Sequence, residues 1–328
     1  MTRNPLVATC LLALCGWHAA AQARLVASAQ MDVYVDTERH QYFDYDITTT
    51  DSRVGVGLSD GVQYISSSAA GRAEYGVVRA RVVSDARNPG STTYRTPTNR
   101  VQVEFRDDVT ILAPGVAVGT PALGTISMSV HAGYSADDQG VSDQSLFNSG
   151  GSLTFRVAAG TGNDSESFQV GALHGYPSGE RRLRVSEYNG SGFDVLYESS
   201  QPGSAGYAFA RDIELDISFL VGVPFTVDVV MRALANAYAA NPGDRATMRV
   251  DAMNTATWGG FSNLRLLDGS PLPDFSAFGA ALGTDYAAAI QPVPLPGPAL
   301  LLAGGAALLG MRRRRAWPGA PVQSTARR

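Results

Sequence analysis

The stretch Arg211-Asp212-Ile213-Glu214-Leu215-Asp216-Ile217-Ser218-Phe219 alternates polar and apolar residues along its whole length. A period of two places the four apolar side chains on one face of an extended strand and the carboxylates of Asp212, Glu214 and Asp216 on the other. The stretch therefore predicts a half-buried β-strand whose carboxylates face solvent.

The same alternation recurs on both sides of this stretch, at residues 101–105, 126–130, 153–157 and 225–231. Asn189-Gly190-Ser191-Gly192 predicts a hairpin turn between two further strands, and Asn241-Pro242-Gly243-Asp244 predicts a second turn. Residues 233–240 are ambiguous between helix and strand, and the polar residues 132–151 lack periodicity and predict a long loop. About a dozen short strands at this spacing predict an all-β, antiparallel β-sandwich or jelly-roll-like body.

The amino-acid composition excludes some classes of protein. The chain has 328 residues, of which 45% are hydrophobic and 17% charged, so it can bury a core and is unlike a disordered chain. All 26 basic residues are arginine, and seven of them lie at the two ends, so 19 basic residues face 30 acidic ones in the body. Because phosphate-backbone binding needs clustered positive charge, we expect no nucleic-acid partner.

The first residues have the three parts of a secretory signal peptide. Arg3 supplies a positive start, residues 6–17 are apolar, and Ala21-Gln22-Ala23 matches the small-x-small cleavage pattern. The sequence therefore predicts a signal helix at residues 1–23 and a mature chain that begins at Arg24. The alternatives are a buried N-terminal helix and a lipoprotein cleaved before Cys15, which the large Leu14 disfavours.

Cysteine is confined to this first segment, at Cys10 and Cys15. The body therefore has neither a disulfide nor a thiolate metal site, and we expect core burial alone to stabilise it.

The C-terminal residues suggest a membrane tail. Val293-Pro294-Leu295-Pro296-Gly297 starts a proline-rich segment, residues 299–311 are apolar, and Arg312, Arg313, Arg314 and Arg315 follow. The apolar run is shorter than the roughly 20 residues that span a bilayer, but arginine can snorkel to the interface. Arginines at this end place it in the cytoplasm and the body outside, the orientation that the signal peptide also imposes.

The order of proline motif, membrane helix and arginine cluster resembles the PEP-CTERM sorting tail, in its VPLPA variant, over about the last forty residues. The resemblance implies an exosortase-type membrane protease as partner, transient anchoring in the inner membrane of a Gram-negative bacterium, and later release to the cell surface or the extracellular matrix. Two departures are Gly297-Pro298 and the extension at residues 316–328. A single-pass anchor that is never cut is the alternative. The expected organisation is a body at 24–268, a Pro/Gly/Ala-rich linker at 269–292, a sorting tail at 293–315 and a cytoplasmic extension at 316–328.

No catalytic residue is predicted. Gly57-Leu58-Ser59-Asp60-Gly61 matches the nucleophile-elbow pattern, but the following residues favour a strand where the elbow needs a helix, so we expect a hairpin turn. His40, His131 and His174 show no paired metal-ligand spacing. The oxygen-rich sites at Asp137, Asp138, Asp164 and Glu166 are candidates for Ca²⁺, with ordinary turn chemistry as the alternative.

Three functions remain open. The first is a non-catalytic surface or matrix protein, the second a carbohydrate-binding module for exopolysaccharide, and the third a secreted hydrolase. Exposed aromatic residues stack on sugar rings, and the candidates near loops are Tyr134, Tyr176, Tyr188 and Tyr197. An aromatic-lined concave sheet favours the second function, and a cleft with two carboxylates favours the third.

Overall fold

The computed structural model describes residues 24–35, 38–46, 51–59, 64–88, 95–139, 149–162, 164–175, 182–188, 192–199, 205–239, 242–272 and 274–290. The predicted signal helix at 1–23 and the sorting tail at 293–315 lie outside these residues. None of the described residues belongs to a helix long and apolar enough to cross a membrane.

The described residues form fifteen antiparallel strands in two sheets and no helix, so the all-β prediction is confirmed. Sheet A has the order β11-β10-β9-β8-β13-β6-β1-β2, with β15 added to the end of β6. Its strands are β1 (Arg24–Val35), β2 (Glu38–Asp46), β6 (Arg95–Leu112), β8 (Ser149–Ala159), β9 (Asp164–Gly175), β10 (Arg182–Tyr188), β11 (Phe193–Ser199), β13 (Phe225–Asn236) and β15 (Ser276–Gly279). Sheet B has the order β12-β7-β14-β5-β4-β3. Its strands are β3 (Asp51–Ser59), β4 (Tyr64–Glu74), β5 (Val77–Arg87), β7 (Pro121–Gln139), β12 (Ala205–Leu220) and β14 (Arg245–Leu266).

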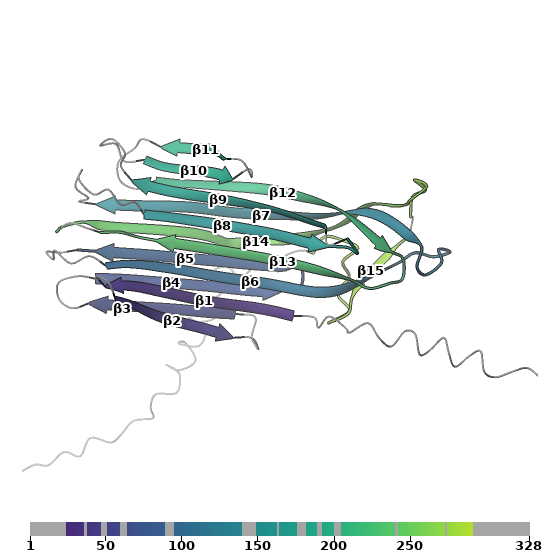
Figure 1. The fold of residues 1–328 in the computed structure, drawn as a ribbon, viewed down its shortest axis with the longest axis horizontal. Helices are drawn as coiled ribbons and strands as arrows, with labels where there is room; N and C mark the ends of the chain where they lie inside the picture. The colour runs from purple at the N-terminus through teal and green to yellow at the C-terminus, as the bar shows by residue number, and fades with distance from the viewer. Residues whose placement is uncertain are drawn as a thin grey trace, which may run out of the picture. The chain divides into compact units, whose positions relative to one another are not determined.

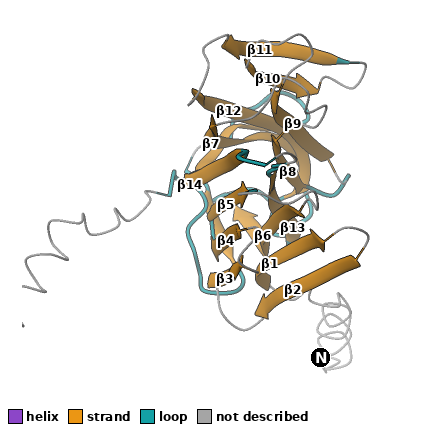
Figure 2. Ribbon diagram, turned by 90° about the vertical axis from the view of Figure 1, so that its left-hand side faces the viewer, coloured by secondary structure: helices purple, strands orange, loops and turns teal. Residues whose placement is uncertain are grey.

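The two sheets lie face to face (Figures 1 and 2) and share one apolar core. Each long strand contributes every second side chain to that core, as the pleat requires. On β12, Ile213, Leu215, Ile217 and Phe219 are buried, whereas Asp212, Glu214 and Asp216 are exposed. The alternation at 101–105, 126–130, 153–157 and 225–231 is buried in the same way, which confirms the predicted strand faces.

Two segments differ from the sequence-based expectation. The predicted loop at 132–151 is wrong over its first part, because β7 continues to Gln139 and β8 begins at Ser149. The ambiguous residues 233–240 begin as the last part of β13. In both places most buried side chains are alanines: Ala132, Ala136, Ala233 and Ala235. Because alanine differs little in hydrophobicity from the residues between, the alternation is too weak to predict a strand.

Sheet A curls over the edge of sheet B at β10 and β11. The ring of Tyr197 on β11 stacks on Tyr207 of β12, with their centroids 5.0 Å apart. Next to them, Arg211 of β12 forms an ion pair with Glu187 of β10 and lies over the Phe168 ring at 5.2 Å. These contacts cover the β12 edge, which would otherwise present unpaired backbone groups.

A buried polar group links the two sheets toward the end of the core where β6 begins. Asn99 of β6 donates through Nδ2 to Ser67 Oγ (2.8 Å), to Ser84 Oγ (3.0 Å) and to the Val83 carbonyl (2.6 Å) of sheet B. Ser84 in turn donates to the Ala235 carbonyl of sheet A at 2.9 Å. Because a buried polar group is costly unless it is hydrogen-bonded, this arrangement favours one registration of the two sheets.

The segment predicted as a linker contains packed structure. Within 269–292, β15 pairs with β6, and Tyr286 is fully buried. Trp258 of β14 donates through Nε1 to the Tyr286 carbonyl (2.8 Å), and its own carbonyl accepts from the Ile290 amide (2.9 Å). The folded unit thus extends to Ile290, three positions before Val293 of the proline motif.

Candidate functional site

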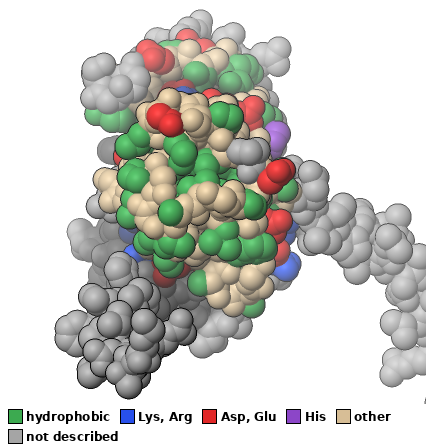
Figure 3. All heavy atoms as spheres, turned by 90° about the vertical axis from the view of Figure 1, so that its right-hand side faces the viewer, with side chains coloured by type: hydrophobic (Ala, Val, Ile, Leu, Met, Phe, Trp, Pro, Cys, Tyr) green, Lys and Arg blue, Asp and Glu red, His purple; other side chains and the backbone are tan. Residues whose placement is uncertain are grey.

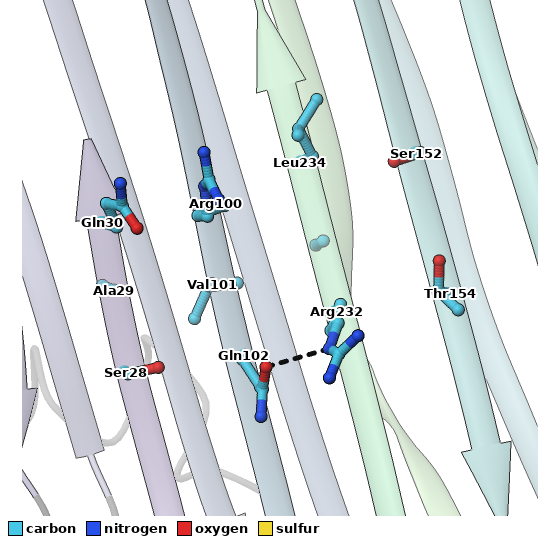
Figure 4. A pocket seen from close by; sticks show the side chains of 11 residues that line it. Ser28, Ala29, Gln30, Arg100, Val101, Gln102, Ser152, Thr154, Arg232 and Leu234 are labelled. Carbon is cyan, nitrogen blue, oxygen red and sulfur yellow. Dashed lines mark hydrogen bonds between the residues drawn. The ribbon is translucent and has the colours of Figure 1, made fainter. Parts of the chain in front are cut away.

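The outer face of sheet A carries a hollow of about 490 Å³ that crosses β1, β6, β13 and β8. Figure 4 shows its polar side chains standing on four adjacent strands. Long side chains, among them Gln30, Arg100, Gln102 and Arg232, rise beside short ones such as Ser152. The difference in side-chain length produces the hollow, since the sheet beneath is continuous.

A second hollow of about 460 Å³ continues this one across β8, β9 and β10. Ser152 and Leu234 line both, and we call the two hollows together the trough. Its floor is low at Gly171, where an added Cβ would meet only the Gly151 carbonyl oxygen at 3.9 Å. Glycine here leaves backbone open to a ligand.

The second hollow is the apolar part of the trough. Leu173 and Phe193, which line it, are 58% and 62% exposed. Tyr188 lies beside Phe193 on the neighbouring strand, with ring centroids 5.3 Å apart. An exposed pair of rings beside hydrogen-bonding groups is typical of surfaces that bind sugar rings.

Strand register places the side chains of the outer face in rows across the strands. One row runs through Ser28, Gln102, Arg232, Thr154, Gln169, Tyr188 and Phe193, from β1 to β11. With neighbouring strands 4.7–4.9 Å apart, this row is roughly 29 Å long. A surface of this length suits an extended polymer better than a small molecule.

The charges of the trough are of one sign. Arg100, Arg184 and Arg232 line it, and no Asp or Glu is among the described residues that do. This contrasts with a body in which acidic residues outnumber basic ones. Glycoside hydrolysis needs a pair of carboxyl groups across the scissile bond, and the described lining of the trough contains none.

The candidate calcium residues do not come together. Asp137 and Asp138 lie near the end of β7, whereas Asp164 starts β9 and accepts hydrogen bonds from the Ser218 amide (3.2 Å) and hydroxyl (3.5 Å). Ser218 is opposite Leu123 on β7, fourteen residues from Asp137, which corresponds to roughly 45 Å along a strand. Glu166 is exposed on β9. Over the described ranges, no three His, Cys, Asp or Glu side chains are grouped so that they could share a metal ion.

The other sequence candidates lie on four different strands. Ser59 ends β3 and is opposite Tyr64, the first residue of β4, so the two strands pair as an antiparallel hairpin, as predicted. His40 is on β2, His131 on β7 and His174 on β9. Asp60 and Gly61 lie outside the described residues.

The tyrosine candidates that the structure describes lie in different environments. Tyr134 is a core residue whose hydroxyl donates to the Val170 carbonyl at 2.7 Å, and burial raises the pKa of its hydroxyl. Tyr197 is packed against Tyr207, and Tyr176 lies outside the described residues. Only Tyr188, among the described candidates, has its ring on the exposed aromatic surface beside the trough.

A hollow of about 370 Å³ on sheet B contains two carboxylates, Asp85 and Asp137. Asp85 is 3.3 Å from Arg87 and 3.8 Å from Arg245, so its charge is balanced by arginine. Such a pair is more typical of an ion-pair network than of a general acid, which must hold its proton.

A separate apolar surface lies at the end of the fold where the loops after β6 and β14 meet β15. Leu112, Val118, Leu267, Phe278 and Leu282 are exposed there. Figure 3 looks onto this end and shows hydrophobic and uncharged atoms over most of its centre. These residues come from the end of β6, from β15 and from neighbouring loops, and they provide a comparison surface for tests of the trough.

The trough residues were not predicted from the sequence. The alternation along β6 and β13 assigns Arg100, Gln102 and Arg232 to the outer faces of their strands, but it does not show that these strands are neighbours. No protein-family model, no curated protein and no solved structure matches the chain.

Proposed function

We propose that this protein is an exported, non-catalytic surface protein whose trough binds an extended polysaccharide. The observation that carries the proposal is the continuous row of hydrogen-bonding side chains on sheet A that ends at the exposed rings of Tyr188 and Phe193. Amide and hydroxyl groups match sugar hydroxyls, and aromatic rings match the apolar faces of sugars.

The proposal combines two of the functions left open by the sequence. The non-catalytic part is supported by the absence of carboxylates from the described lining of the trough. The hydrolase alternative would have to use Asp85 and Asp137 on sheet B, of which Asp85 is engaged by two arginines. We therefore favour binding over hydrolysis.

Export and sorting are the other part of the proposal. The signal peptide at 1–23, the motif Val293 to Gly297 and the cluster Arg312 to Arg315 support secretion, transient anchoring in the inner membrane and processing by an exosortase-type protease. A protein delivered to the surface in this way would meet the exopolysaccharide of its own cell.

A glycan array probed with the full chain and with a Tyr188→Ala/Phe193→Ala variant tests the binding function. Loss of two stacked rings, at about 0.5–1.5 kcal/mol each, should weaken polysaccharide binding by roughly tenfold. The control is Phe278→Ala, which removes an exposed ring at the loop end. Equal binding by all three proteins, or no binding to any polysaccharide, would exclude the trough as a sugar site.

A further inference from the structure

Two arginines of the trough, Arg100 and Arg232, lie among amide and hydroxyl side chains. Arg232 donates through Nε to Gln102 Oε1 at 2.9 Å, which holds the guanidinium in the row (Figure 4). Its partner is a neutral amide, and Arg232 makes no ion pair within the described part of the chain. The hydrogen bond to Gln102 therefore holds the Arg232 guanidinium in place, and no carboxylate of the described residues is paired with its positive charge.

Arg100 adds a second positive charge one step along the sheet. Gln102 is opposite Arg232, and Arg100 is opposite Leu234, so the two arginines are diagonal neighbours on adjacent strands. Diagonal pairs of this kind are about 7–8 Å apart at Cα, within reach of long side chains. The guanidinium of Arg232 can form paired hydrogen bonds to a carboxylate, and Arg100 is the nearest arginine on the same face of the sheet.

We propose that the trough selects acidic polysaccharides, whose sugars carry carboxylates, with Arg232 as the residue that determines this specificity. This inference rests on the proposed polysaccharide-binding function. The surrounding amides and hydroxyls, such as Gln30, Ser28 and Thr154, are suited to the sugar hydroxyls between successive carboxylates.

We expect acidic polymers to bind only at the trough, because acidic residues outnumber basic ones in the body as a whole. Over the rest of the surface, the excess of carboxylates opposes the approach of any polyanion. A polysaccharide with one carboxylate per sugar can place its charges in the trough while its hydroxyls contact the uncharged side chains. The ligand class therefore follows from both Arg232 and the uncharged groups around it.

The experiment compares three polymers that separate charge from sugar. Polygalacturonate has both, its methyl ester has the sugar without the charge, and polyglutamate has the charge without the sugar. Binding to the full chain is measured by affinity electrophoresis at low and high salt, with a melting temperature for every variant to confirm folding.

We expect polygalacturonate to bind about threefold more tightly than its ester at low salt, since one exposed ion pair contributes roughly 0.2–1 kcal/mol. The advantage should shrink at high salt because exposed charges are screened. Arg232→Gln should lower polygalacturonate binding toward the level of the ester, and it should affect ester binding less because glutamine keeps a hydrogen-bonding side chain in the row. Arg249→Gln, an exposed arginine of sheet B, is the matched control and should change neither.

The outcomes distinguish this inference from the function on which it rests. If the ester binds as tightly as polygalacturonate, acid selectivity is wrong while sugar binding stands. If neither sugar polymer binds, the polysaccharide function is wrong as well. If polyglutamate binds as tightly as polygalacturonate and loses the same affinity in Arg232→Gln, the arginine recognises charge alone and the assignment to polysaccharide is overturned.

Discussion

The hydroxyl of Tyr286 donates a hydrogen bond to Oδ2 of Asp107 at 3.2 Å, and both side chains are fully buried. The other carboxylate oxygen of Asp107 accepts from the amides of Asp108 (2.9 Å) and Ala281 (3.2 Å). Asp107 belongs to β6, whereas Tyr286 follows β15, so this contact joins the last described segment to the central strand of sheet A. Gly279 lies against both side chains and leaves no space for a Cβ.

We predict that Tyr286→Phe lowers the free energy of unfolding by about 1–3 kcal/mol, because the buried Asp107 carboxylate loses a donor. Urea unfolding measures the change. Tyr197→Phe, which removes a hydroxyl but keeps the ring stacked on Tyr207, should leave stability within about 0.5 kcal/mol of the parent. Equal effects of the two substitutions would contradict a structural role for the Tyr286 hydroxyl.

A second prediction concerns pH. Burial is the main cause that raises the pKa of Asp107 above its ordinary value of 3.8, and its hydrogen bonds oppose the shift only in part. A carboxyl with a raised pKa keeps its proton longer in the folded state than in the unfolded state. Stability from this group is therefore complete below pH 3.8 and decreases as the pH rises through the raised pKa.

Asp107→Asn removes this titration while it retains an acceptor for the two amides. The difference in unfolding free energy between Asp107→Asn and the parent should shift in favour of the variant as pH increases from 3.8 toward neutrality. Urea unfolding across a pH series measures it. Parallel curves for the two proteins would show that Asp107 does not titrate abnormally.

The boundary of the folded body gives a third prediction. A chain that ends at Asp268 lacks β15, Tyr286 and the partner of the Trp258 indole, whereas one that ends at Ile290 keeps them. Loss of several buried side chains and their hydrogen bonds should make the shorter chain less stable by about 4 kcal/mol or more. If thermal unfolding of the two chains coincides, residues 269–290 act as a linker after all.

The fourth prediction tests the trough by filling it. Gly171→Leu places a side chain in open space on the floor of the trough, so it should weaken polysaccharide binding by roughly tenfold or more without loss of the fold. Gly206→Leu is the control, because Gly206 is an exposed strand glycine of sheet B. Titration calorimetry with a bound polymer measures the effect, and unchanged binding by Gly171→Leu would place the ligand elsewhere.

The fifth prediction concerns the sorting tail. Replacement of Arg312 to Arg315 by alanine removes the positive charges that oppose translocation of the C-terminal end. We expect the protein to pass through the membrane or to insert poorly, as measured by alkaline extraction and protease accessibility in spheroplasts. Replacement of Arg327 and Arg328, farther from the apolar run, should retain the membrane-bound form. Unchanged membrane association in the first variant would remove the physical basis of the tail.

Much of the fold was predictable because a strand that is half buried shows its environment in its own sequence. Residues 211–219 predict their strand, their buried face and their exposed carboxylates, and the structure confirms all three. The prediction was wrong at 132–139, where alanine, glycine and serine alternate with little contrast in hydrophobicity. It also did not anticipate β15, because the short strand is surrounded by proline, glycine and alanine.

The sequence by itself determined which residues form strands and which side of each strand is apolar, because local alternation reflects burial directly. It also carries the features from which export and sorting are proposed. Only the tertiary structure decided that β1, β6, β13, β8, β9, β10 and β11 are consecutive neighbours, and so that Gln102 and Arg232 share one row with Tyr188 and Phe193. Strand order depends on the packing of segments more than a hundred residues apart, such as β6 and β13, and no local pattern encodes that distance.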